Sequence, residues 1–155
     1  MSLFATTQFG PVDYKEEAVW EFPHGLPAFE DQTRFLPIEQ PGYAPIVFLQ
    51  SLIRPELCFL TVPVEVLTPD YRLNAAAEDL TALELNTAAQ PKIGEEVLCL
   101  AILSVTGNQP PTANLLAPVV VNLKNRRAVQ AVRLDAAYSH QHPLAVENRE
   151  EARCL

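Results

Sequence analysis

The chain has 155 residues, of which 48% are hydrophobic and 19% are charged, and its formal net charge at pH 7 is −8. This length and composition favour one folded domain with a buried core and exclude a disordered chain. A membrane helix is excluded as well, because no apolar run approaches the roughly 20 residues that such a helix needs.

Negative charge is concentrated in residues 1–111, which hold 15 acidic and 5 basic residues, whereas residues 112–155 hold 4 acidic and 6 basic ones. Such a surface repels a polyanion such as nucleic acid and attracts a basic protein. The alternative is that the charge only keeps the protein soluble. The chain starts without a basic segment followed by an apolar one, so we expect no secretory signal and a cytoplasmic protein.

Short strands separated by proline are predicted for the start of the chain. Apolar and aromatic residues favour strands at 5–9 and 18–22, with Gly10-Pro11 as the break between them. Residues 22–31 then combine prolines, a glycine and two aromatic residues. This composition is typical of a rigid loop whose rings and Leu26 are buried.

The next segment is predicted to form a strand, a hairpin and a turn. Residues 34–38 have strand composition, and the runs 45–52 and 57–66 are joined by a break of hairpin length. Thr68-Pro69-Asp70-Tyr71 is typical of a turn, because proline fits its corner and aspartate can bond the backbone.

One helix and one central strand follow. Residues 75–85 have apolar side chains at helical spacing, and Asn74 is placed to cap that helix. The continuous apolar run 97–105 predicts a strand that is buried on both faces.

The stretch 112–132 predicts a second hairpin. Residues 115–123 are nearly all apolar and β-branched around Pro118, which we expect at a bulge or an edge because proline lacks an N–H. Residues 124–127 form a basic tip in which Asn125 can adopt positive φ.

These elements together predict a mainly β fold. We expect a small antiparallel β-barrel-like or two-sheet domain with one short helix over residues 1–144, and a flexible C-terminal tail over 145–155.

No residues are arranged for a recognisable catalytic chemistry. The sequence lacks a phosphate-binding glycine loop, a nucleophile elbow and a zinc-protease helix. Cys58 and Cys99 lie in apolar runs, which favours buried, unreactive thiols. The open alternatives are a generic protein-binding β-domain and a small metal-dependent hydrolase that uses His140, His142 and an acid such as Asp135.

Several short motifs, in this order along the chain, are similar to those of the FliW flagellar assembly factor family. They are Phe22-Pro23-His24-Gly25-Leu26-Pro27-Ala28-Phe29-Glu30, Phe48-Leu49-Gln50-Ser51, Pro55-Glu56-Leu57-Cys58-Phe59, Pro69-Asp70-Tyr71, the segment from Thr112 to Asn122, Tyr138-Ser139, and His142-Pro143-Leu144.

The resemblance implies a bacterial, non-enzymatic regulator without a cofactor or metal. Such a protein binds the carbon storage regulator, which is a small basic dimer that represses translation by binding mRNA, and it also binds flagellin. We expect a monomer when neither partner is bound.

The resemblance also suggests which residues contact the basic partner. These are Glu56, Glu65 and Asp70 as charges and Tyr71 as an anchor. One departure from the family pattern is Arg72, since acidic residues often follow the Pro-Asp-Tyr turn in this family.

Overall fold

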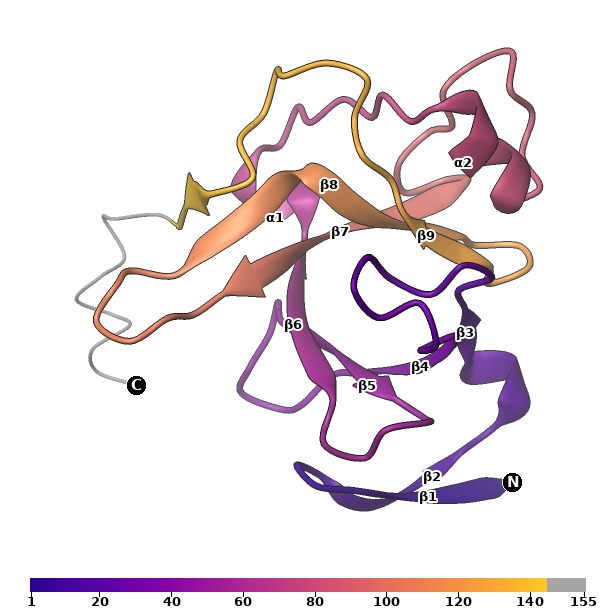
Figure 1. Cartoon of the computed structure of the whole chain (residues 1–155), viewed down its shortest axis with the longest axis vertical. Coiled ribbons are helices and arrows are strands. Elements are labelled where there is room, and N and C mark those ends of the chain that lie inside the picture. The colour runs from indigo at the N-terminus through magenta and orange to yellow at the C-terminus, as the bar shows by residue number, and fades with distance from the viewer. Residues whose placement is uncertain (145–155) are drawn as a thin grey trace.

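The computed structural model describes residues 1–144, and the predicted flexible tail at 145–155 lies outside the described residues. The fold is mainly β and antiparallel, as predicted (Figure 1). The main sheet has eight strands in the order β10-β8-β7-β6-β5-β4-β3, with β9 also paired to β8. Its strands are β3 (Trp20–Glu21), β4 (Arg34–Ile38), β5 (Val47–Ser51), β6 (Cys58–Pro63), β7 (Val97–Ser104), β8 (Thr112–Asn122), β9 (Ala128–Gln130) and β10 (His142–Pro143).

The sheet curves until its two ends meet, which gives it a barrel-like shape. The Glu21 N–H donates to the carbonyl of Arg126 at 3.0 Å, and Glu21 forms a parallel bridge with Arg127. Apolar side chains from both ends of the sheet fill the interior, among them the fully buried Phe35 and Val119. Burial of this apolar surface is the main stabilising contribution.

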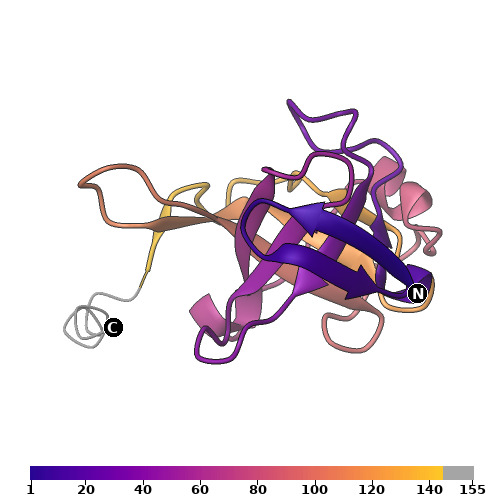
Figure 2. The ribbon, with the colours of Figure 1, turned by 90° about the horizontal axis from the view of Figure 1, so that it is seen from below.

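A two-stranded hairpin at the N-terminus lies across the underside of the barrel (Figure 2). It consists of β1 (Ser2–Thr6) and β2 (Gly10–Tyr14), so the strand predicted at 5–9 was wrong. The turn comes earlier because Gly10 adopts φ +66° and pairs with Thr6. The strand predicted at 18–22 shrinks to β3, which follows a 3-10 turn, η1 (Glu16–Ala18).

The hairpin of β5 and β6 confirms the pairing predicted for 45–52 and 57–66, but its second strand ends at Pro63. The chain then forms a short helix, α1 (Val64–Leu67), which the prediction of one helix missed. Pro63 lacks the N–H that a continuing strand would use, and Val64 turns into the core with no exposed surface.

The second helix, α2 (Ala77–Ala82), is shorter than the predicted 75–85, and Asn74 does not cap it. Ala76 occupies the N-cap position, while Asn74 donates its side-chain amide to Asp135 at 2.8 Å. In the described chain, no helix is long and apolar enough to cross a membrane.

The predicted central strand and second hairpin are confirmed by β7, β8 and β9. The expected burial of the central strand on both faces holds only for its first part, since Ser104 and Val105 are exposed. The pairing of β7 with β8 shifts register between Leu100 and Ile102, and Pro118 lies in the extra length of β8 at this bulge. At the hairpin tip, Arg126 rather than Asn125 takes the positive φ. Beyond the bulge, the far ends of β7 and β8 extend away from the barrel (Figure 2).

The loop at 22–31 is packed largely as predicted, with Phe22 and Leu26 buried and Phe29 half-buried. Gly25 has φ +64°, and a Cβ atom there would lie 2.5 Å from the backbone oxygen of Glu30. Only glycine fits this close approach of two backbone segments.

Candidate partner-binding site

Two segments that are distant in sequence run side by side at one end of the barrel. Residues 68–76 lead from α1 to α2, and residues 131–139 lead from β9 towards β10 (Figure 1). Leu134 N–H donates to the carbonyl of Asn74 at 3.2 Å, and Arg72 N–H donates to the Tyr138 hydroxyl at 3.3 Å. The Pro69-Asp70-Tyr71 turn is therefore held by the C-terminal part of the described chain.

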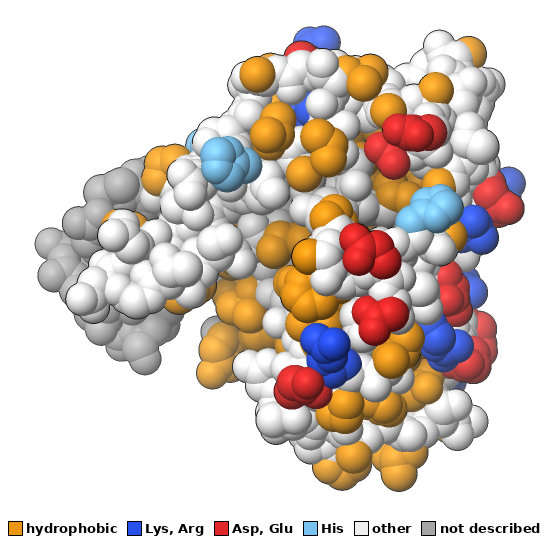
Figure 3. Space-filling view, viewed as in Figure 1, with side chains coloured by type: hydrophobic (Ala, Val, Ile, Leu, Met, Phe, Trp, Pro, Cys, Tyr) orange, Lys and Arg blue, Asp and Glu red, His pale blue; other side chains and the backbone are white. Residues whose placement is uncertain are grey.

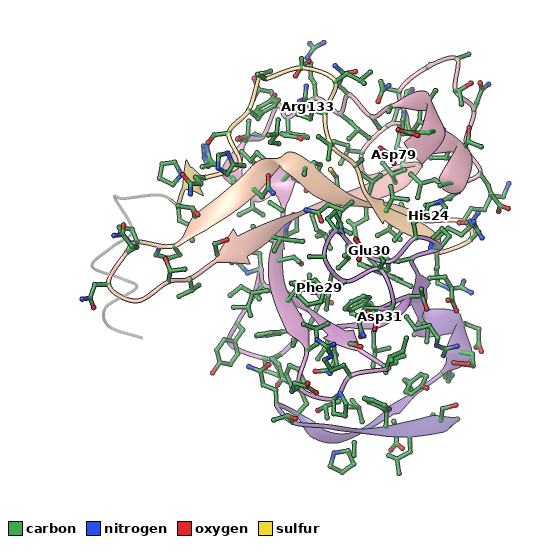
Figure 4. The ribbon with its side chains drawn as sticks, viewed as in Figure 1. His24, Phe29, Glu30, Asp31, Asp79 and Arg133 are labelled. Carbon is green, nitrogen blue, oxygen red and sulfur yellow. The ribbon has the colours of Figure 1, made fainter. Side chains whose placement is uncertain are left out.

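Arg133 belongs to the second of these segments, and its side chain packs against the first (Figure 4). This side chain is only 4% exposed. Its guanidinium donates to the carbonyl of Arg72 and to the carboxylate of Asp135, with Nε 2.9 Å from Oδ1. The same group lies 5.3 Å from the ring centroid of Tyr71 and 4.6 Å from that of Tyr138. We call Arg133, Tyr71, Tyr138 and Asp135 the arginine clasp.

Within the clasp, Tyr71 is 7% exposed and donates its hydroxyl to the carbonyl of Leu115 at 2.6 Å. Burial raises the pKa of Tyr71 to about 12. Tyr71 therefore fixes the turn to strand β8 rather than presenting an aromatic side chain to solvent.

The charges of the clasp stabilise one another. Burial opposes the charge of Arg133, but the hydrogen bond to Asp135 and the neighbouring Tyr71 outweigh this and raise its pKa. The hydrogen bond from Arg133, together with the Ala137 N–H and the Asn74 amide, holds the pKa of Asp135 well below its usual range.

A groove of about 530 Å³ lies beside the clasp, lined by residues 64–65, 69, 71–73 and 90–93. The Gln90 side chain closes one end, because its amide accepts from the Ala75 N–H at 2.7 Å and donates to the Ala75 carbonyl at 3.0 Å. The segment around Gln90 is thus tied by hydrogen bonds to the segment that carries the Pro69-Asp70-Tyr71 turn.

The structure brings three of the four predicted contact residues to this end of the barrel. Glu65 lines the groove and is exposed, Asp70 is exposed on the turn, and Tyr71 is buried in the wall. Glu56 lies beyond the opposite end of β6, where it pairs with Arg54 at 3.7 Å.

Arg133, Gln90 and Lys92 were missed by reasoning from the sequence. Arg133 lies between Val132 and Leu134, which are 54% and 66% exposed, so the usual pattern of polar residues outside and apolar residues inside is inverted there. An isolated arginine in an apolar stretch was the only available signal.

A second acidic region lies on the face shown in Figure 3, over the 22–31 loop and α2. Glu30, Asp31 and Asp79 gather around His24 on this face (Figure 4). Burial first, and the charge of Glu78 second, raise the pKa of Asp79, which His24 partly offsets. These acidic side chains share one face of the molecule, where uncharged and hydrophobic side chains separate them (Figure 3).

The arrangement expected for a metal-dependent hydrolase is not found in the described part of the chain. Among residues 1–144, no group of three His, Cys, Asp or Glu side chains is placed to hold a metal ion. Asp135 is engaged by the clasp instead. Burial raises the pKa of the Cys58 thiol to about 11 and that of Cys99 to about 12, which makes both poor nucleophiles.

Comparison with known proteins gives one consistent result. Residues 3–144 match the family model described as FliW protein. The flagellar assembly factor FliW of Syntrophomonas wolfei is 31% identical over 140 residues, which cover 90% of this chain and 86% of that protein. The factor of Bacillus subtilis is 29% identical, covering 92% and 96%. A crystal structure of the flagellar assembly factor FliW superposes with a TM-score of 0.80 at 27% identity, covering 94% of this chain and 99% of that one.

Proposed function

Because the chain belongs to the FliW family of flagellar assembly factors, we propose that it couples flagellin synthesis to flagellum assembly by binding two proteins in turn. One partner is the carbon storage regulator, a basic mRNA-binding dimer, and the other is flagellin. The protein acts in the cytoplasm by binding and has no catalytic activity. The family match over residues 3–144 is the observation that carries this proposal.

The charge of the protein supports the proposal that it binds the carbon storage regulator. The protein carries a net charge of −8, and its exposed acids include Glu65 and Asp70 beside the groove and Glu56 at the far end of β6. A basic protein is drawn to such a surface, and an acidic protein bound beside an RNA-binding surface disfavours the phosphate backbone. In this arrangement Tyr71 acts by holding the turn that presents Asp70.

Exchange of partners then links synthesis to assembly. Flagellin that accumulates occupies the protein and frees the regulator, which represses flagellin translation. Export of flagellin leaves the protein free to bind the regulator again, and translation resumes.

Calorimetric titration with the carbon storage regulator of the same organism, at low and at raised salt, tests the first step. We expect binding that weakens as salt rises, since exposed charges are screened. The variant E65K/D70K should bind at least tenfold more weakly. Absence of binding at both salt concentrations would contradict the proposal.

A matched control separates local contacts from net charge. E17K/E39K makes the same change in charge, but Glu17 and Glu39 line the hollows beside the N-terminal hairpin and are exposed. Equal loss of affinity in both variants would mean that only net charge matters and that Glu65 and Asp70 are not contacts.

A further inference from the structure

We propose that the groove beside the arginine clasp is the docking site for a flagellin segment that carries an apolar side chain and a nearby carboxylate, with Arg72 as the anchor. This inference rests on the proposed function and assigns a place to its second partner. It also distinguishes the two partners, because a cationic anchor such as Arg72 does not attract the basic regulator.

The chemistry of the groove selects such a segment. Apolar surface in the groove comes from Pro69, which is exposed, and Ile93, which is half-buried. Two cations line it as well, Arg72 and Lys92, in a protein with 19 acidic residues against 11 basic ones. Apolar surface beside a guanidinium fits an apolar side chain followed by a carboxylate, which arginine can bind through two hydrogen bonds.

Arg72 is the stronger anchor of the two cations. Lys92 is 76% exposed and lies 3.9 Å from the carboxylate of Glu95, a pair that water and salt screen. Arg72 has no carboxylate within ion-pair distance among the residues that the structure describes. Its guanidinium is thus available to a carboxylate of the partner.

The backbone of Arg72 is fixed from both sides, which leaves only its side chain to be ordered on binding. Its N–H donates to the Tyr138 hydroxyl, and its carbonyl accepts from the buried guanidinium of Arg133. A segment that docks against this wall does not have to order it first, so less free energy is lost on binding.

In this proposal, the position of Glu65 makes binding of the two partners mutually exclusive. Glu65 lines the same groove, on α1, and is one of the acids proposed to meet the regulator. A flagellin segment in the groove covers this acid and places its own carboxylate close to the regulator's surface. The regulator is then released without any change of fold.

Titration of monomeric flagellin and of the carbon storage regulator from the same organism tests the proposal with variants of opposite charge. We expect R72E to bind flagellin about thirtyfold more weakly or worse, as for an arginine hot spot. The same variant should bind the regulator as well as the wild type or better, because it adds an acid. The E65K/D70K variant should lose the regulator.

R54E is the matched control. Arg54 is exposed and lies beyond the other end of β6, and its replacement by glutamate changes the charge by the same amount. This variant should bind flagellin within about twofold of the wild type. Thermal unfolding of R72E at the wild-type temperature would show that the variant is folded.

The outcomes separate the proposal from the function on which it rests. If R72E and the wild type bind flagellin equally well, the groove is not the docking site for flagellin, but the proposed function still stands. Loss of both partners in R72E also overturns the groove as the docking site. A wild-type protein that binds no flagellin overturns the second partner itself.

Crosslinking gives an independent measurement. A photoreactive benzoylphenylalanine in place of Lys92 should capture a flagellin peptide that holds Asp or Glu within four residues of a large apolar side chain. The same group in place of Lys124, on the β8–β9 hairpin tip, should not. Capture of the regulator, or of a second copy of this chain, at position 92 would contradict the assignment.

Discussion

Replacement of Arg133 by methionine should destabilise the protein while leaving its apolar packing largely intact. Methionine keeps an unbranched stem of similar length but has no donor and no charge. The substitution removes the hydrogen bond to the carbonyl of Arg72 and the cation that faces the rings of Tyr71 and Tyr138.

The expected loss can be worked out from these contacts. A hydrogen bond to a charged group contributes about 1.5 kcal/mol, and each cation–π contact about 0.5–1 kcal/mol. Asp135 is exposed and regains water when Arg133 is replaced, so the loss of its ion pair adds little to this sum. The total is about 2.5–3.5 kcal/mol, which corresponds to a fall in Tm of roughly 5–14 °C for a chain of this size.

Urea unfolding followed by Trp20 fluorescence measures this loss, because Trp20 is buried and is the single tryptophan of the chain. R72M is the control, since it makes the same substitution at an exposed neighbour and should change the free energy of unfolding by less than about 0.5 kcal/mol. If R133M were as stable as R72M, the clasp would not hold the two segments together.

Three further changes test other parts of the structure. Tyr71→Phe removes the hydroxyl that donates to the Leu115 carbonyl, so it should cost about 1–2 kcal/mol in urea unfolding and abolish a phenol ionisation near pH 12 in ultraviolet titration. Gly25→Ala should cost at least about 2 kcal/mol because of its positive φ and the 2.5 Å approach to backbone, whereas Gly42→Ala, with nothing within 4 Å, should cost only about 1 kcal/mol. The lowered pKa of Asp135 contributes stability that is present above its ordinary pKa of 3.8 and is lost as the pH falls towards the lowered value. The difference in urea midpoint between the wild type and Asp135→Asn should therefore narrow below about pH 4. A difference that widens below this pH would contradict a lowered pKa for Asp135.

The long β-branched runs made the centre of the fold predictable. Residues 97–105 and 112–132 satisfy strand propensity and burial together, and both were placed correctly. The ends of strands and helices were harder to predict, because they depend on single residues whose effect cannot be read from the surrounding sequence pattern. Gly10 closes a turn instead of separating two strands, and Pro63 ends a strand so that a four-residue helix can begin.

The candidate site was only partly predictable for a different reason. Tyr71 and Asp70 were selected as candidate contacts because they belong to a short motif of consecutive residues, which can be read from the sequence. Arg133 acts on Arg72 from 61 positions away, and no local pattern encodes a contact of that range. Burial of Tyr71 likewise depends on the bulged strand β8, to which its hydroxyl is bonded.

Displacement of the carbon storage regulator by flagellin is the most direct test of the proposed exchange of partners. A complex of this protein with fluorescently labelled carbon storage regulator is titrated with monomeric flagellin, and the anisotropy of the regulator is recorded. For the wild type we predict a fall to the value of the free regulator, and for R72E no fall at the same flagellin concentrations. A wild-type protein that binds both partners at once, with the anisotropy unchanged or raised, would contradict the exchange of partners at this end of the barrel.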